Sequence, residues 1–525
     1  MKNKNFKNGI IFGTALLFIS ASFVSAYQNE VFNRISNDSE ILQSDRYTNL
    51  IEHQYGIDLF STKKYRVMEN PIPLRDLGGT SNNLPVEFVD TPVEFTWISD
   101  DGKDWTTRAK NQGNCGSCWL FAAMGALESV INIREECADL NPDLSEQYVL
   151  SCLPLAGSCN GGNVDHVVYY YIMNTSGDGN YVNGVLTEDN FSYQSNFNYI
   201  PPCSDKPPDW EDYLIPISDY WESWPNLNDP NLKDTIKSLL YQKGPLMAYF
   251  WASERFIRWG TFVKDPSKYY PDYNEDCPQY VNHGMTIVGW KDDPSITNGG
   301  YWICKNTWGP NWGYNGFFNI EYDCLNLGGF ISWVDYDPES YDWPPVANAG
   351  GFYQGITGEE IIFDGSKSVD AEDAIAAYEW DFGDDTNANG SVVSHIYSVQ
   401  GVYPVTLCVT DSTGQETSQT TLVGVDENPL SMEISGGLGL KIGFTNPVDA
   451  ELKNINYQID LKGLILPNKI AGIYQSIPAD ARVETTLNIY GIGLGSAQVS
   501  INGYSTTAGF FILGPFVKVI NALLR

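Results

Sequence analysis

The sequence predicts an α+β domain followed by two all-β domains. A helical run begins at Cys118, and later segments of the same region have the short apolar, β-branched pattern of strands. Beyond the Pro-Pro pair at 344–345, short alternating runs are separated by Gly, Asn and Asp instead, which is typical of β-sandwiches. A chain of 525 residues suits about three or four domains of ordinary size.

The first 26 residues have the pattern of a secretory signal peptide. Three lysines precede an apolar core from Ile10 to Val24, and Val24-Ser-Ala26 is a small-residue cleavage site. The apolar run is shorter than the ~18–20 residues of a membrane span, and no later segment qualifies. We therefore expect a protein that is secreted or associated with the cell surface, without a transmembrane anchor.

Residues 27–83 are polar and poorly periodic, and they end in a segment rich in Gly, Ser and Asn. This composition predicts a propeptide that is cleaved near Gly78–Leu84, because exposed flexible chain is easily cut. The alternative is a disordered spacer of the same composition.

A reactive thiol is indicated by Gln112-Gly-Asn-Cys-Gly-Ser-Cys-Trp119. Cys118 begins the helical run, and the partial positive charge of a helix N-terminus favours the thiolate. Two later segments, Val281-Asn-His-Gly-Met285 and Lys305-Asn-Thr-Trp-Gly309, supply His283 and Asn306. A thiol, a base and a group that orients the base make up the set needed for nucleophilic acyl transfer.

The downstream part of this region reads as strands over Leu246–Trp251, Met285–Trp290, Tyr301–Lys305 and Phe317–Tyr322. The stretch before them, from Asp165 to Pro245, is rich in Tyr, Asn, Asp and Pro, and we expect it to be dominated by loops.

The segment Cys115-Gly-Ser-Cys-Trp119 resembles the signature of papain-like cysteine peptidases. Leu144-Ser-Glu-Gln147 and Cys159-Asn-Gly-Gly162 agree with the same family, and the resemblance runs from about Leu84 to about Asp337. It implies a two-lobed papain-like peptidase domain over residues 84–341. A thioredoxin-like redox pair is the competing reading of Cys-x-x-Cys, but here the Trp follows the second cysteine and no βαβ pattern lies nearby.

The resemblance also implies roles for single residues. It makes the protein a cysteine-type peptidase that needs no cofactor or metal, acts on protein or peptide substrates and is synthesised as a zymogen. The implied residues are Cys118 as nucleophile, His283 as acid and base, Asn306 to orient the histidine, Gln112 in the oxyanion hole, Trp308 as a cover, and Gly161 and Gly162 along the substrate.

Export makes disulfide bonds plausible among the ten cysteines. The resemblance implies three pairs, Cys115–Cys159, Cys152–Cys203 and Cys277–Cys324. Cys137, Cys304 and Cys408 are left over. Cys304 has the strand position of a core residue, whereas Cys408 shares its strand face with threonines.

Residues 342–426 resemble a PKD domain, an immunoglobulin-like sandwich, in Pro345-Val-Ala-Asn-Ala-Gly350 and in Tyr378-Glu-Trp-Asp-Phe-Gly-Asp384. Trp380 and the alternating Val405, Leu407 and Val409 are its expected core. Its aspartates fit turn capping better than a calcium site. Residues 427–525 are predicted to form a second sandwich of unknown role.

The net charge of −34 disfavours binding to nucleic acid or anionic membranes, because both require clustered Lys and Arg. Only four histidines occur, so no His-based metal cluster is available. We expect a monomer whose β-domains bind substrate or a surface polymer. Two other functions use the same sequence features: an adhesin with an inactive peptidase domain, and a transpeptidase that passes the acyl group to an amine.

Overall fold

The structure is a computed structural model. It describes residues 65–74, 87–163, 167–174, 183–196, 198–273, 277–372, 374–463, 465–466, 469–479, 481–487, 489–501, 504–514 and 516–523. The predicted signal peptide and most of the predicted propeptide lie outside these residues. Among them, no helix has both the length and the apolar character that a membrane crossing requires.

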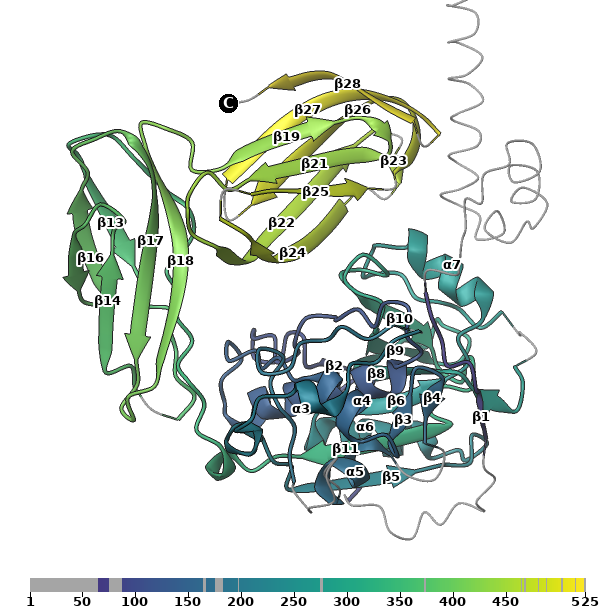
Figure 1. Ribbon diagram of the computed structural model, residues 1–525. Coiled ribbons are helices and arrows are strands. Elements are labelled where there is room, and N and C mark those ends of the chain that lie inside the picture. The colour runs from purple at the N-terminus through teal and green to yellow at the C-terminus, as the bar shows by residue number, and fades with distance from the viewer. Residues whose placement is uncertain are drawn as a thin grey trace, which may run out of the picture. The chain divides into compact units, whose positions relative to one another are not determined.

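The first domain combines five helices with a seven-stranded antiparallel sheet (Figure 1). The strand order is β10-β9-β8-β6-β11-β5, and β2 also pairs with β8. The strands are β2 (Glu94–Thr96), β5 (Asp219–Ser223), β6 (Leu246–Phe250), β8 (His283–Asp292), β9 (Gly300–Lys305), β10 (Phe317–Glu321) and β11 (Phe330–Asp335). The four strands expected from the sequence are among them, with ends that differ by up to two residues.

The helices of this domain are α3 (Cys118–Arg134), α4 (Glu146–Cys152), α5 (Val168–Asn174), α6 (Leu232–Lys243) and α7 (Glu254–Phe262). Helix α3 is buried continuously from Cys118 to Asn132 and packs against β6 and β8. A helix that is apolar on most sides must lie inside a domain, and α3 does. Buried side chains form two main clusters, one around α3, α4 and α5 and the other among the sheet, α6 and α7.

The expectation of loops between Asp165 and Pro245 was wrong in part. This stretch contains α5, β5 and α6, together with 3₁₀ turns at Cys203–Asp205 and Trp210–Tyr213. In α6, Leu232, Ile236, Leu239 and Leu240 recur at helical spacing and are buried. Because most of the stretch is rich in turn-forming residues, the short helical repeat of apolar residues in α6 was overlooked.

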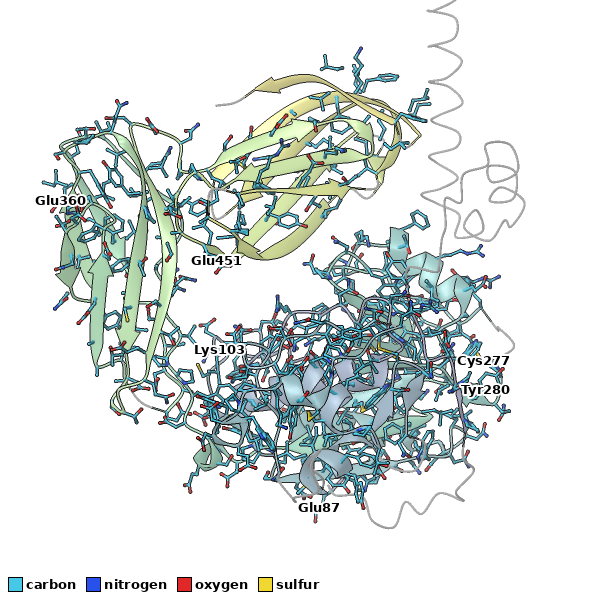
Figure 2. The ribbon with its side chains drawn as sticks, in the orientation of Figure 1. Glu87, Lys103, Cys277, Tyr280, Glu360 and Glu451 are labelled. Atoms are coloured by element: carbon cyan, nitrogen blue, oxygen red, sulfur yellow. A yellow bond between two sulfur atoms is a disulfide. The ribbon has the colours of Figure 1, made fainter. Side chains whose placement is uncertain are left out.

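Four two-residue strands complete the first domain: β1 (Ile72–Pro73), β3 (Gly157–Ser158), β4 (Gly161–Gly162) and β7 (Tyr280–Val281). Strand β1 pairs with β7 and β3 pairs with β4. Tyr280, which is labelled in Figure 2, marks the position of β7. A last 3₁₀ turn, Pro338–Ser340, follows β11.

The residues that resemble a PKD domain form a five-stranded sheet, of order β12-β18-β17-β14-β15, and a two-stranded sheet, β13-β16. Trp380, Val405, Leu407 and Val409 are all buried in its core, as predicted. The strands are β12 (Tyr353–Gly355), β13 (Glu360–Asp364), β14 (Ala377–Asp381), β15 (Asn387–Asn389), β16 (Val392–Ile396), β17 (Gly401–Thr410) and β18 (Glu416–Val425).

The aspartates considered for calcium have protein partners. Asp381 accepts a hydrogen bond from the Gly383 amide, and Asp384 contacts Thr386 and His395, the latter at 2.8 Å. These contacts support the turn-capping interpretation.

The last part of the chain has two sheets that share one cluster of buried side chains. A three-stranded sheet has the order β19-β21-β25, and a seven-stranded sheet has the order β20-β28-β27-β26-β22-β24, with β23 on β26. The strands are β19 (Ser431–Ser435), β20 (Gly437–Leu438), β21 (Leu440–Thr445), β22 (Leu452–Lys462), β23 (Ile465–Leu466), β24 (Lys469–Ile477), β25 (Arg482–Leu487), β26 (Tyr490–Ile501), β27 (Tyr504–Gly514) and β28 (Phe516–Leu523).

Candidate active site

Cys118 is the first residue of α3 and is fully buried. The loop before it is held by the Cys115–Cys159 disulfide and by the Gly116 amide, which donates to the Cys159 carbonyl at 2.8 Å. A Cβ on Gly116 would lie 2.4 Å from that carbonyl oxygen, so only glycine allows the two segments to approach this closely.

His283 and Asn306 meet beside Cys118 from neighbouring strands. His283 begins β8 and Asn306 follows β9, and the Nε2–H of His283 donates to Oδ1 of Asn306 at 2.8 Å. The Trp308 ring stacks on the imidazole with 4.2 Å between ring centres. Within the described residues Nδ1 of His283 makes no hydrogen bond, so this nitrogen is the one available for proton exchange.

Contacts between α3 and β8 place the histidine next to the thiol. The Gly284 amide hydrogen-bonds to the Cys118 sulfur. A Cβ on Gly284 would also come within 2.9 Å of the Cys118 carbonyl oxygen. The start of β8 therefore lies against the start of α3, and the three residues singled out in the sequence are brought together.

Gln112 is fully buried, and its side-chain amide is fixed on both sides. Its Nε2 donates to the Cys115 carbonyl at 2.7 Å, and its Oε1 accepts from the Thr307 hydroxyl. An amide nitrogen has two protons, so the second remains for a ligand. Thr307 was missed by the sequence analysis, although its place directly after Asn306 was a usable signal.

Residues 65–74, from within the predicted propeptide, lie across this site. The Met68 amide donates to the Asn282 carbonyl at 2.8 Å and also reaches the Cys118 sulfur. The Asn70 amide donates to the Asn160 carbonyl at 3.0 Å, and the Arg66 carbonyl accepts from Trp308 at 2.8 Å. Met68 is 1% exposed.

Burial of the site changes the protonation of both groups. It raises the pKa of the Cys118 thiol to about 12, although nearby backbone amides, that of Met68 included, lower it, and it lowers the pKa of His283 to about 3. The charged thiolate and imidazolium are thus disfavoured in the closed site, because a low-dielectric environment penalises the charged forms. The sequence argument considered only the helix terminus and did not foresee the covering segment.

Two of the three predicted disulfides are present. Cys115–Cys159 and Cys152–Cys203 have sulfur–sulfur distances of 2.11 Å. The third predicted pair, Cys277–Cys324, stays a prediction, because residues 274–276, which adjoin Cys277, lie outside the described residues. Cys304 is buried, as expected.

Comparison with known proteins agrees with this geometry. The model of the "Papain family cysteine protease" matches residues 91–330, and that of the "PKD domain" matches residues 342–425. A viral cathepsin of Spodoptera exigua nuclear polyhedrosis virus is 30% identical over 265 residues, which cover 48% of this chain and 67% of that protein.

The chain belongs to the papain family of cysteine proteases.

Other relatives of this cysteine-type peptidase share a comparable sequence identity with it. Cathepsin J of Mus musculus is 31% identical over 248 residues, covering 45% of this chain and 64% of its own. Fruit bromelain of Ananas comosus is 29% identical over 295 residues, covering 55% and 70%. Among solved structures, digestive procathepsin L 3 of Tenebrio molitor larval midgut has a TM-score of 0.37 and 21% identity, covering 53% and 77%.

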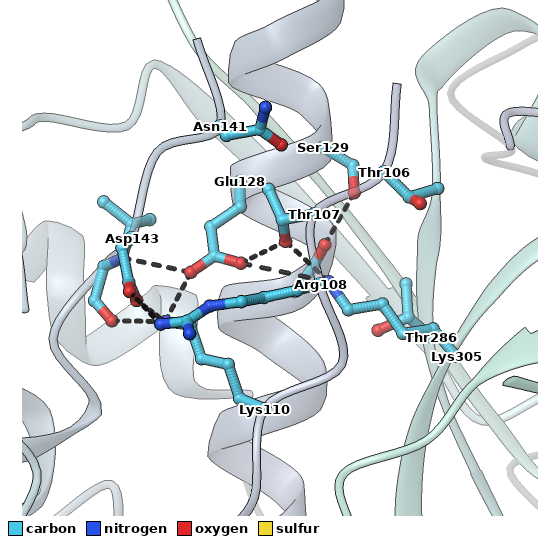
Figure 3. A network of polar contacts seen from close by, with 12 residues as sticks. Thr106, Thr107, Arg108, Lys110, Glu128, Ser129, Asn141, Asp143, Thr286 and Lys305 are labelled. Atoms are coloured by element: carbon cyan, nitrogen blue, oxygen red, sulfur yellow. Dashed lines mark hydrogen bonds and ion pairs between the residues drawn. The ribbon is translucent and has the colours of Figure 1, made fainter. Parts of the chain in front are cut away.

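A buried ionic network lies directly behind the site of this papain-family protease (Figure 3). Glu128 of α3 is fully buried, with Lys110 at 2.6 Å and Lys305 at 3.9 Å. Lys305 also donates to the Thr107 hydroxyl at 2.6 Å. Because Lys305 directly precedes Asn306, the network joins α3 to the strand that presents the asparagine.

The charges in this network are strongly coupled. Burial lowers the pKa of Lys305 to about 8, even though Glu128 opposes the shift. For Lys110, burial also disfavours the charge, but the carboxylates of Glu128, Glu146 and Asp143 outweigh burial and raise its pKa. A single acidic residue within a mostly apolar helix was the sequence signal for this network, and the sequence analysis did not use it.

Replacing Glu128 by Gln should lower the free energy of unfolding by about 3–5 kcal/mol, because it removes the paired carboxylate of the buried Lys305 and one of the three carboxylates around Lys110. Urea unfolding measures the change, with Cys118→Ala in every protein compared so that none can cleave itself. The matched control is Glu94→Gln, whose exposed pair with Lys291 at 2.8 Å should be worth about 1 kcal/mol or less. Equal losses in the two variants would show that the network is not stabilised by its charges.

Proposed function

We propose that this peptidase hydrolyses peptide bonds through a thioester on Cys118. The Cys118 thiol passes its proton to Nδ1 of His283, and the sulfur attacks the peptide carbonyl carbon to form a C–S bond. His283 gives this proton to the amine as the C–N bond breaks. It then takes a proton from the water that attacks the thioester, and the C–S bond breaks to release the carboxyl product and the Cys118 sulfur. The observation that carries this proposal is the His283–Asn306 hydrogen bond beneath the Trp308 ring, next to the thiol at the start of α3.

Asn306 holds the imidazole by its Nε2–H, so that Nδ1 is directed to the reacting atoms. Trp308 shields that hydrogen bond from water, where it would be weaker. The second Nε2 proton of Gln112 and the Cys118 amide would stabilise the oxyanion, a contribution typically worth about 2.7–4 kcal/mol per donor.

Substrate would bind in extended form along the segment that contains Gly161 and Gly162. In the structure the neighbouring Asn160 carbonyl already accepts a backbone hydrogen bond, from the amide of Asn70 in the covering segment. Backbone pairing of this kind is a common mode of peptide recognition. A Cβ on Gly162 would lie 3.0 Å from the Trp119 ring, which favours glycine there.

Residues 27–83 would act as an inhibitory propeptide. Residues 65–74 support this role, because the buried Met68 covers the site and the segment hydrogen-bonds to Asn282, Asn160 and Trp308 around it. The two disulfides of the described residues fit an oxidising, extracellular location.

Mature protein incubated with a peptide library, with products read by mass spectrometry, tests the activity directly. Cleaved peptides are the expected result. An added amine nucleophile distinguishes hydrolysis from acyl transfer, because a transpeptidase would yield the amide product. Intact peptides in every fraction would favour an adhesin with an inactive peptidase domain.

The two β-rich regions are proposed to bind large or surface-bound substrates and to be dispensable for small ones. Trp343 donates to the Tyr336 hydroxyl at 3.0 Å and belongs to the core of the first domain. The truncation should therefore end after Pro345 rather than before Trp343. We expect this truncated protein to cleave a short fluorogenic peptide within a few-fold of the full mature chain.

Cleavage of a bulky or polymer-bound protein substrate by the truncated form should fall much further. A truncated protein that folds, by circular dichroism, yet no longer cleaves the short peptide would mean that the β-rich regions help to build the active site.

A further inference from the structure

The seven-stranded sheet at the end of the chain exposes several large apolar side chains on the face turned away from its core. In β27 the residues Thr506, Ala508, Phe510 and Ile512 are buried on one side. Their alternates on the opposite face, such as Phe511 and Leu513, are exposed. Strand side chains point alternately to the two faces of a sheet, so these exposed residues do not contribute to the core.

The strand register gathers the exposed apolar residues at one place. Leu494 of β26 lies opposite Phe511 of β27, and Leu513 of β27 lies opposite Phe516 of β28. Phe516 in turn lies opposite Leu438 of β20. Directly opposed residues of antiparallel strands share a face. We define the outer apolar patch as Leu438, Leu494, Phe511, Leu513, Phe516 and Ile520, whose exposed fractions range from 43% to 73%.

This part of the sheet also carries few charges, and the one on its outer strands is Lys518, which lies opposite Phe511. From Thr485 to Val517 the sequence contains no Asp, Glu, Lys or Arg. Residues 430–525 hold six acidic and seven basic side chains, a net +1, whereas the whole chain carries −34. Charge depletion around exposed aromatic and aliphatic side chains is the composition of the buried centre of a protein interface.

The size of the patch fits a specific interface. Its six side chains expose roughly 700 Å², above the ~300–600 Å² of the largest patch on a typical monomer. A stable complex buries about 800 Å² on each partner, so the patch with its immediate rim would suffice.

We propose that two copies of this chain associate through the outer apolar patch, face to face. Sheets pack on sheets through apolar faces of this kind, and a twofold axis presents the same patch to itself. The acidic excess elsewhere in the chain opposes an anionic lipid surface, whereas the four strands that form the patch carry a single charged side chain, Lys518. This dimer replaces the monomer expected from the sequence, and it does not depend on the proposed catalytic mechanism.

Sedimentation velocity of the full chain tests the proposal, with Cys118→Ala throughout to prevent self-cleavage. Between about 1 and 100 μM protein we expect an equilibrium between monomer and dimer, with no species larger than the dimer. The double substitution Leu494→Gln and Phe511→Gln should weaken dimerisation at least tenfold. Thr507→Gln, on the same face of β27 but at its polar end, is the matched control and should leave the equilibrium unchanged.

Thermal unfolding shows whether each variant is folded, and Leu438→Gln on the edge strand β20 serves as the independent variant if the double substitution unfolds. A chain that stays monomeric over the whole range would overturn the proposal. Dimerisation that neither the double substitution nor Leu438→Gln weakens would overturn it as well. Binding of the monomer to phosphatidylcholine vesicles, lost in the double variant, would assign the patch to a lipid surface and would also overturn it.

Discussion

Replacing Cys118 by Ala is expected to abolish peptidase activity while the fold stays intact. The thiol is the only nucleophile next to His283, and its removal leaves no group that can form the acyl intermediate. Nucleophile and base act as a unit, so His283→Ala should have a similarly large effect, a loss of roughly 10⁴-fold or more in kcat. Turnover of a fluorogenic peptide by the mature protein measures both losses.

The matched control is Cys304→Ala, which removes another fully buried thiol from β9. This variant should retain activity with some loss of stability, because its side chain only fills the core. Retention of most activity by the Cys118 or His283 variant would contradict the proposed mechanism.

Release of residues 65–74 should increase activity strongly, because the segment covers the thiol from substrate. Burial raises the pKa of Cys118 to about 12 in the covered site, and opening the site to solvent should relieve part of that shift. The rate of iodoacetamide labelling at Cys118 follows the thiolate and should rise sharply on cleavage.

One substitution can release the segment without cleavage. Met68 lies buried over the thiol, so Met68→Asp in the full chain should raise both labelling and peptide turnover. Glu69→Gln, at an exposed neighbouring position, is the control and should change neither. A full chain that is already as active as the cleaved form would show that the segment is not an inhibitor.

The pH dependence of release follows from His283. Its pKa is about 3 under the segment and near the ordinary 6.5 once exposed, so the released site binds a proton that the covered site excludes. Attachment of the segment is therefore fully favoured above about pH 6.5 and weakens as the pH falls towards 3. Faster processing at acidic pH is the expected result for a released site in which Cys118 keeps its proton, because only then does release take up a proton.

The local features of this protein were readable from the sequence. The helix at Cys118, the strands that present His283 and Asn306, and the core of the PKD domain depend on short-range patterns of apolar residues. The close approach of the three site residues also depends on Gly116 and Gly284, and the contacts that require those glycines appear only in three dimensions.

What the sequence did not predict depends on contacts between distant segments. Met68 covers Cys118 from 50 positions away, which no periodicity encodes. The network around Glu128 requires four segments to meet, and helix α6 was hidden in a stretch rich in turn-forming residues. The outer apolar patch has the same origin, since only the strand register unites its members.

Labelling of the mature protein with a peptidyl epoxide, followed by peptide mapping, tests the central claim most directly. We predict one adduct per chain, on Cys118, and none within the same time in His283→Ala, because the base is needed to keep the thiolate at neutral pH. Labelling at Cys137 or Cys408 while Cys118 stays unmodified would contradict the assignment of Cys118 as the nucleophile.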